Sequence, residues 1–208
     1  MAHTFLTDAA KKALSDAVRD VESRCNAELV MAVRARSGSY LHADLIAGIA
    51  VALAMLAALL FSPWPFDLVW FVIDPLLAGI LGALLASRLP AVRRALTFQR
   101  VRRRLVETAA RSTFVEKGVH ATTGRTGVLL YISLLEHEAA VIHDLGIETL
   151  ATTEGWRLAA EEIEEAVRRG EDGVAVAALV RALGDVLSPA LVRSADDVDE
   201  LANEVSER

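Results

Sequence analysis

Two apolar runs, one directly after the other, constrain this chain more than any other feature. Residues 45–61 hold 17 residues without a charge, and residues 68–87 hold 20 residues with a single carboxylate, Asp74. About 17–25 apolar residues are enough for a helix to cross a bilayer. Only helices satisfy their own backbone hydrogen bonds in lipid, so the sequence predicts a two-helix transmembrane hairpin with its turn at residues 62–67. A buried helix pair in a soluble protein is the alternative, but runs this apolar on every face favour the membrane.

Basic residues gather on one side of this hairpin. Residues 88–104 contain seven arginines and no acid, whereas the turn contains no Lys or Arg and one acid. Cytoplasmic loops carry the excess of Lys and Arg, so we expect a two-pass protein of the cell inner membrane with both termini cytoplasmic. The arginines expected at the membrane surface are Arg88, Arg93, Arg94, Arg100, Arg102, Arg103 and Arg104.

The position of these arginines beside an apolar span favours the lipid bilayer as their partner. Each basic residue near an anionic leaflet contributes about 1 kcal/mol of attraction. A nucleic-acid interface needs aromatic residues or a recognition helix with the basic cluster, so no nucleic acid is expected. Asp74 is interpreted as lying near headgroup depth, because two helices without a partner acid or base offer no ion pathway.

The remaining sequence alternates helix and strand patterns. Apolar residues at three- and four-residue steps predict helices at about residues 8–24, 105–117, 153–169 and 172–187. The helix at residues 105–117 is expected to continue from the second span. Alternating or continuous apolar runs predict strands at residues 28–36, 127–134 and 139–143. Together they predict an α/β fold, an α+β sandwich with a small mixed sheet flanked by helices, interrupted by the transmembrane hairpin.

This organisation divides the chain into parts. Residues 1–42 and 90–193 are expected to form one α/β domain, with the hairpin at residues 43–89 and an acidic tail at residues 194–208. The single cysteine, Cys25, excludes an intrachain disulfide framework and a cysteine-based zinc site. The first dozen residues lack the apolar segment of a signal peptide, which agrees with a cytoplasmic domain.

The common catalytic signatures do not occur in the chain. It has no phosphate-binding Gly-rich loop, no dinucleotide fingerprint and no nucleophile elbow, and the spacing of His137 and His143 does not suit a zinc-binding helix. What remains is a pair of loops. Arg125 precedes one predicted strand and Asp144 follows its predicted antiparallel neighbour, so the two should meet at one end of the sheet. They form either a plain ion pair or part of a small anion or metal site.

Several segments together resemble the TPM-domain family, in particular its bacterial branch with a membrane hairpin inserted in the domain. They are ESRCNAELVMAVRARS at residues 22–37, Phe114 with Gly118, TTGRTGVLLYISLLEHEAAVIHDLGIE at residues 122–148, and Trp156. The resemblance implies an α/β sandwich, and family members have been linked with phosphatase activity, with calcium or magnesium binding and with upkeep of membrane protein complexes. Many relatives display the domain outside the cytoplasm and carry a Gly-rich tail, and this chain departs from both features.

Carried over by motif, the resemblance draws attention to Arg125, Thr126, Gly127 and Asp144, of which Arg125, Thr126 and Asp144 are candidate ligand or metal residues. The leading hypothesis is a membrane-anchored interaction or assembly module on the cytoplasmic face, with a membrane-protein partner and no assigned catalytic residue. The alternative is a divalent-metal-dependent phosphatase in which Asp144 is a ligand or an acid. A metal-assisted hydrolase gathers several acids or histidines at its site, and this requirement separates the two hypotheses.

Overall fold

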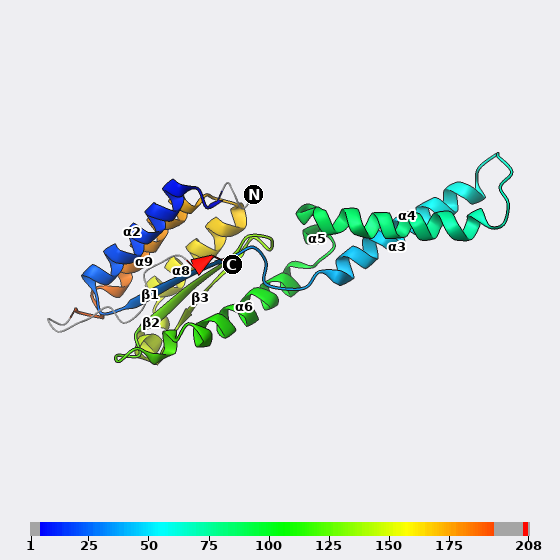
Figure 1. The fold of residues 1–208 in the computed structure, drawn as a ribbon. Coiled ribbons are helices and arrows are strands. Elements are labelled where there is room, and N and C mark those ends of the chain that lie inside the picture. The colour runs from blue at the N-terminus through cyan, green and yellow to red at the C-terminus, as the bar shows by residue number, and fades with distance from the viewer. Residues whose placement is uncertain (1–4, 194–205, 208) are drawn as a thin grey trace. The chain divides into compact units, whose positions relative to one another are not determined.

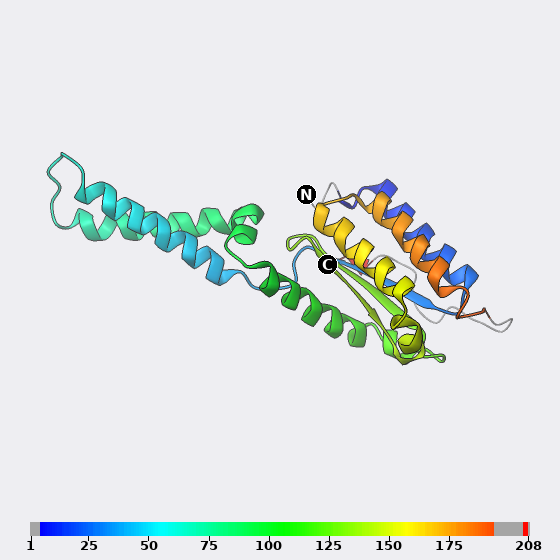
Figure 2. The ribbon, with the colours of Figure 1, turned by 180° about the vertical axis from the view of Figure 1, so that it is seen from behind.

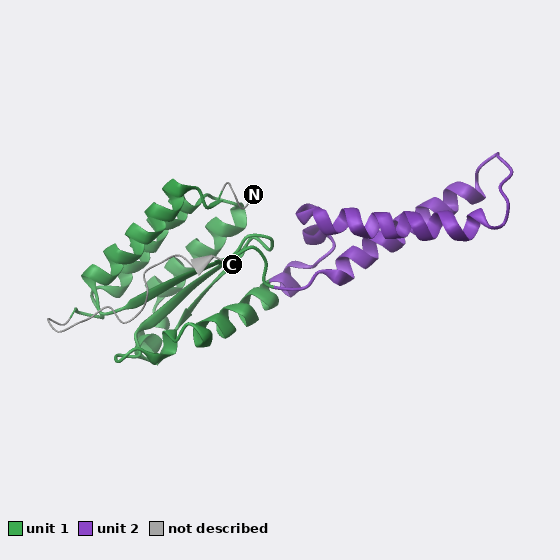
Figure 3. Ribbon diagram, viewed as in Figure 1, with its two compact units in different colours: residues 1–37, 103–208 green, residues 38–102 purple. Residues whose placement is uncertain are grey.

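The computed structural model describes residues 5–193 and 206–207. It divides the chain into two compact units, one of residues 1–37 and 103–208 and the other of residues 38–102 (Figure 3). The second unit is thus an insertion in the first. It is longer than the predicted hairpin of residues 43–89 because it also contains the basic segment that follows the hairpin. The predicted acidic tail lies outside the described residues, except for residues 206–207.

A mixed sheet forms the centre of the first unit. Its strands are β1 (Glu28–Arg34), β2 (Gly127–Ser133), β3 (Glu138–His143) and β4 (Ser206–Glu207), in the order β3-β2-β1-β4. Strand β2 runs parallel to β1 and antiparallel to β3, and the short β4 runs parallel to β1. The predicted α+β class and its small mixed sheet are confirmed. Strand β4 has no counterpart in the sequence analysis, because two residues carry no periodicity.

Helices cover both faces of this sheet (Figures 1 and 2). On one face lie α2 (Asp8–Arg24), α8 (Glu154–Arg169) and α9 (Gly173–Leu187), and on the other lies α6 (Gln99–Glu116). Successive strand residues point to opposite faces, so each strand contributes to two cores. Leu29 and Met31 of β1 belong to the core under the three helices, whereas Val30 and Ala32 belong to the core under α6.

Side-chain caps set the starts of the helices on the first face. Thr7 accepts a hydrogen bond from the amide of Ala10 at 3.1 Å, and Asp172 accepts one from the amide of Ala175 at 2.9 Å. Such caps satisfy amides that have no partner inside the helix. Gly170 ends α8 with φ of 80°, a conformation that glycine adopts without strain. The predicted limits of these helices therefore agree with the structure within about two residues.

The inserted unit consists of α3 (Leu41–Leu60), α4 (Trp70–Arg88) and the short α5 (Pro90–Ala95). Helices α3 and α4 are each long and apolar enough to cross a membrane. They pack through small residues: a Cβ atom built on Gly48 would lie 2.7 Å from the carbonyl oxygen of Gly79. Close approach at glycine is typical of helix pairs in membranes.

The connection from the hairpin to α6 differs from the prediction. The sequence analysis expects one helix running on from the second span, but α4 ends at Arg88, and α5 and residues 96–98 separate it from α6. Pro90 lacks a backbone N–H and disfavours helical geometry at Leu89, which has an extended backbone with ψ of 96°. The prediction of a continuous helix is therefore wrong.

Candidate functional site

Arg125 and Asp144 form a bidentate ion pair at one end of the sheet. Nε of Arg125 donates to Oδ2 of Asp144 at 2.7 Å, and Nη2 donates to Oδ1 at 2.9 Å. The arginine side chain is 50% exposed and the aspartate side chain is 5% exposed. Arg125 lies two residues before the start of β2, and Asp144 immediately follows β3. Because these strands are antiparallel neighbours, the structure brings the two predicted residues together.

The backbone around the pair is closely packed. Arg125 has φ of 52°, in the left-handed region that non-glycine residues seldom adopt. A Cβ atom on Gly146 would lie 2.6 Å from the carbonyl oxygen of Arg125, and one on Gly127 would lie 2.1 Å from that of Val119. Gly146 also donates a backbone hydrogen bond to the Arg125 carbonyl at 2.8 Å. Gly127 therefore has a packing role at this end of the sheet.

Thr126 joins the loop to β1 rather than pointing at a ligand. Its hydroxyl donates to the carbonyl oxygen of Asn26 at 2.6 Å, and its amide donates to the hydroxyl of Thr122 at 3.1 Å. Thr126 and Thr122 are both buried. These hydrogen bonds hold the loop before β2 against the start of β1.

The charge on Asp144 is stabilised by its surroundings. Burial raises the pKa of Asp144, but the hydrogen bonds from Arg125 and from the Leu145 amide, together with the charges of Arg125 and His120, outweigh it and lower the pKa below its ordinary value. The carboxylate in turn raises the pKa of Arg125. At neutral pH the site is a neutralised pair.

The residues at this end of the sheet do not fit a divalent cation. Calcium and magnesium take several oxygen ligands, whereas both carboxylate oxygens of Asp144 already accept hydrogen bonds from Arg125. Within the described part of the chain, no three His, Cys, Asp or Glu side chains gather in a group that could hold a metal ion. Calcium or magnesium binding at Arg125, Thr126 and Asp144 thus has no geometric support.

The structure separates six of the seven predicted membrane-surface arginines into two groups, and the seventh, Arg94, is half-buried. Three of them make contacts within the protein. Arg93 forms a bidentate pair with Asp44 at 2.9 and 2.7 Å, Arg102 donates to the carbonyl oxygen of Arg94 at 2.9 Å, and Arg103 pairs with Glu107 at 3.1 Å. The Asp44 pair could not be predicted from the sequence, because a lone acid at the start of an apolar run shows no partner by spacing.

The other group faces outward. Arg88, Arg100 and Arg104 are exposed and make no ion pair with another described residue. In the inserted unit, exposed apolar side chains alternate with the arginines: Phe98 is 84% exposed, and Leu89 and Val101 are also exposed. A segment that mixes exposed apolar and basic residues is typical of a membrane interface.

A buried polar cluster at the opposite end of β2 was missed by the sequence analysis. Ser133 donates a hydrogen bond to Glu136, and its Oγ accepts one from the hydroxyl of Ser37 at 2.7 Å. The Ser37 hydroxyl also lies 3.0 Å from that of Tyr131. Glu136 and Ser133 are fully buried. The available signal was weak, because a carboxylate in a strand turn is normally exposed.

The fold and these sites define a class of protein: a mixed α/β sandwich whose chain is interrupted after β1 by an apolar helical hairpin, with a neutralised ion pair at one end of the sheet. The chain is similar to the BA42 protein of the psychrophilic bacterium Bizionia argentinensis, solved by NMR, with a TM-score of 0.58 and 17% identity over 98% of this chain and 96% of that chain. At this identity, the similarity shows the fold alone. No family model and no curated protein matches the chain.

Proposed function

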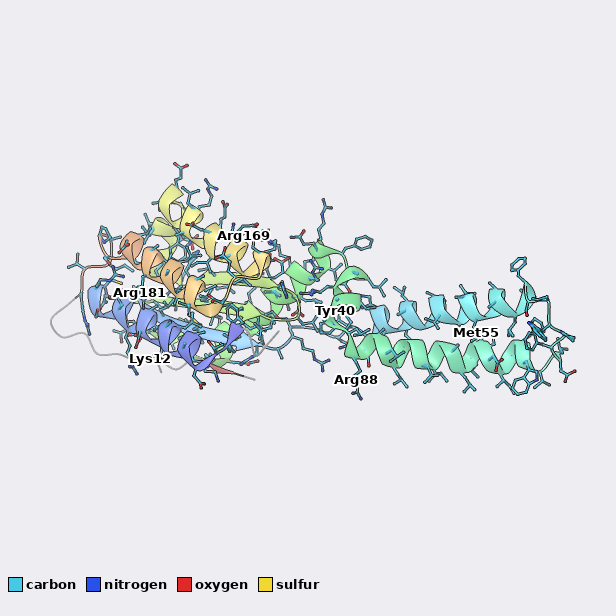
Figure 4. All side chains as sticks on the ribbon, turned by 90° about the horizontal axis from the view of Figure 1, so that it is seen from above. Lys12, Tyr40, Met55, Arg88, Arg169 and Arg181 are labelled. Carbon is cyan, nitrogen blue, oxygen red and sulfur yellow. The ribbon has the colours of Figure 1, made fainter. Side chains whose placement is uncertain are left out.

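We propose that this protein is a membrane-anchored α/β module of the TPM-domain kind, which crosses the cell inner membrane twice and binds another membrane protein on the cytoplasmic side. The observation that carries the proposal is the exposure of α3 and α4. Large apolar side chains project from both helices, and Met55 of α3 is one of them (Figure 4). Only 22% and 11% of the residues in their most apolar stretches are buried.

This exposure argues against a core helix pair of a soluble protein, because such helices bury most of their apolar surface. Contiguous exposed apolar area beyond a few hundred Å² marks a protein or membrane contact. The packing of Gly48 against Gly79 also suits lipid surroundings, where close backbone approach replaces the hydrophobic effect between helices. A bilayer would remove the whole exposed apolar surface of the hairpin from water.

The orientation follows from charge. The exposed Arg88 ends α4 and the exposed Arg100 lies in the basic segment that follows, whereas the turn at residues 62–67 carries Trp64 and no basic residue. By the positive-inside rule, the base and both parts of the α/β domain lie in the cytoplasm. Trp64 suits the opposite interface.

The module role is supported by the state of the Arg125–Asp144 site. A metal-dependent phosphatase needs a cluster of metal ligands and a free acid or base. Here the carboxylate and the guanidinium neutralise each other. This pair therefore does not supply the metal ligands or the free acid that the phosphatase alternative requires.

Cysteine labelling tests the topology. Cys25 is 1% exposed, so the native background is low. With a membrane-impermeant maleimide, we expect Asp67→Cys in the turn to label in intact cells and the exposed Lys12→Cys of α2 to label only after lysis. The reverse pattern would overturn the orientation, and extraction of the protein by alkaline carbonate would overturn the anchor.

A phosphatase assay tests the module role. The purified protein in detergent should not hydrolyse p-nitrophenyl phosphate in the presence of magnesium or calcium. Turnover that Asp144→Asn abolishes would replace the module with the phosphatase hypothesis.

A further inference from the structure

A charged groove runs along α8 within the first unit, away from the Arg125–Asp144 pair. It has a volume of about 670 Å³. Its lining comes chiefly from the glutamates of α8, with Arg103 of α6 and the apolar Leu158 contributing to the walls. The lining residues used below are Arg103, Leu158, Glu161, Glu162, Glu164 and Arg168.

The groove lining holds four glutamate carboxylates and three guanidinium groups, of which Arg168 pairs with Glu165 and Arg169 pairs with Glu171 outside the lining. Arg103 is shared between Glu107 at 3.1 Å and Glu164 at 3.5 Å. Glu161 pairs with Arg157 at 2.9 Å. Glu162 is exposed and makes no ion pair or hydrogen bond with another described residue. The groove therefore keeps a negative surplus after its internal pairs are formed.

A buried carboxylate behind the lining adds to this surplus. Glu138 of β3 is 1% exposed, and its Oε2 lies 3.5 Å from Nε of Arg168 in the groove wall. Neither Oε1 of Glu138 nor Nε of Arg168 has a hydrogen-bond partner among the described residues. Glu138 is not part of the groove lining, but its carboxylate adds negative charge behind the wall that Arg168 forms.

The same excess of carboxylates affects the pKa of Glu164. Its burial raises the pKa of Glu164, and the neighbouring carboxylates of Glu138 and Glu107 raise it further, against the opposite effects of Arg103 and Arg168. An additional cation in the groove would favour the ionised form.

We propose that this groove binds a basic segment of another protein chain, whose Lys or Arg side chains enter beside Glu162 and Glu164. Leu158 is 51% exposed at the groove, where it can contact the aliphatic part of such a side chain. A bare divalent cation suits the groove less well, because guanidinium groups already stand among its carboxylates. This inference rests on the proposed interaction module and names its binding surface.

Fluorescence anisotropy with a labelled nona-arginine peptide tests the proposal on the full chain in a neutral detergent. We expect binding that weakens with salt, and at least a tenfold loss of affinity in Glu162→Gln/Glu164→Gln. The matched control is Asp16→Asn/Glu148→Gln, which removes the same charge at exposed positions outside the groove and should stay within twofold of wild type. Circular dichroism checks that both variants fold.

Every other outcome contradicts the proposal that the groove binds a basic segment of another protein. Equal losses in the groove and control variants would show attraction to overall charge only, and no binding by the wild type would remove the site. Self-association broken by the groove variant would make a second copy the occupant and overturn the assignment to another protein. Because the assay is done in detergent, its failure leaves the membrane topology standing, and a reversed topology leaves the groove affinity unchanged.

Discussion

The backbone amide of Ser37 donates a hydrogen bond to the buried carboxylate of Glu136, with an N–O distance of 2.8 Å. Ser37 is the last residue of the first unit before the inserted unit begins. Glu136 lies in the turn between β2 and β3 and also accepts a hydrogen bond from Ser133. The turn therefore fixes the point at which the chain leaves the sheet.

Replacing this carboxylate should destabilise the first unit. Glu136→Ala leaves the Ser37 amide and the Ser133 hydroxyl without their acceptor, and we expect a loss of about 3 kcal/mol in the free energy of unfolding. Urea unfolding followed by circular dichroism measures it. Glu148→Ala, at a side chain that is 66% exposed, is the control and should change the free energy by less than about 0.5 kcal/mol. Equal effects would contradict the role given to Glu136.

The lowered pKa of Asp144 predicts a specific dependence of stability on pH. A carboxyl group with a lower pKa in the folded state than in the unfolded state binds fewer protons when folded. Its stabilisation is complete above the unfolded value of about 3.9 and is lost as the pH falls through the lower folded value.

The test compares the wild type with Asp144→Asn in urea unfolding between pH 7 and pH 2. We expect the variant to be less stable at pH 7 and the difference to shrink below about pH 4. A difference that stays constant down to pH 2 would mean that the charge of Asp144 is not involved.

Substitutions at two glycines distinguish the effect of close packing on stability from the effect of backbone flexibility. Gly127→Ala would place a methyl group 2.1 Å from the Val119 carbonyl oxygen, so we expect a loss of about 3 kcal/mol or a failure to fold. Gly155→Ala, in the first turn of α8, meets nothing closer than 3.6 Å and should leave stability unchanged or raise it by up to about 1 kcal/mol. Thermal unfolding of both variants measures the contrast, and a stable Gly127→Ala would contradict the close approach.

The hairpin should separate when a large side chain replaces its contact glycine. Gly79→Leu forces α3 and α4 apart, because a Cβ atom there already lies 3.1 Å from the Cβ atom of Ala52. Spin labels on the exposed Leu53 and Leu77 should report a longer or broader distance distribution in this variant. Ala54→Leu, at an exposed position of α3, should leave the distribution as in the wild type. An unchanged distribution in Gly79→Leu would exclude packing through this glycine.

Arg93 and Arg100 should behave differently although both lie in the basic segment. Arg93→Gln removes the partner of Asp44, which is 8% exposed, so the start of α3 should exchange its amide hydrogens faster. Arg100 is exposed and makes no such pair, so Arg100→Gln should leave this exchange unchanged. Hydrogen exchange with mass spectrometry measures the exchange rate of residues 41–48 in both variants. Equal exchange in the two variants would show that the Asp44 pair contributes no protection.

The sequence alone determined the elements whose signals are local. Apolar spacing placed α2, α8 and α9, and the caps at Thr7 and Asp172 set the starts of α2 and α9. The length of the apolar runs marked α3 and α4. Each of these signals lies within one segment of the chain. Strand polarity in a hairpin is also local, and it predicts that Arg125 and Asp144 meet at one end of the sheet.

Only the tertiary structure decided which distant groups meet. Glu136 reaches an amide 99 residues away, Arg93 is held by Asp44 49 residues away, and Glu138 lies buried beside Arg168 of another element. No pattern in the chain encodes these pairs, because each depends on how elements far apart in the sequence pack in space. The same packing decides that Asp144 is already neutralised and that the glutamates of α8 line a groove, which sequence spacing reports only as a charged helix face.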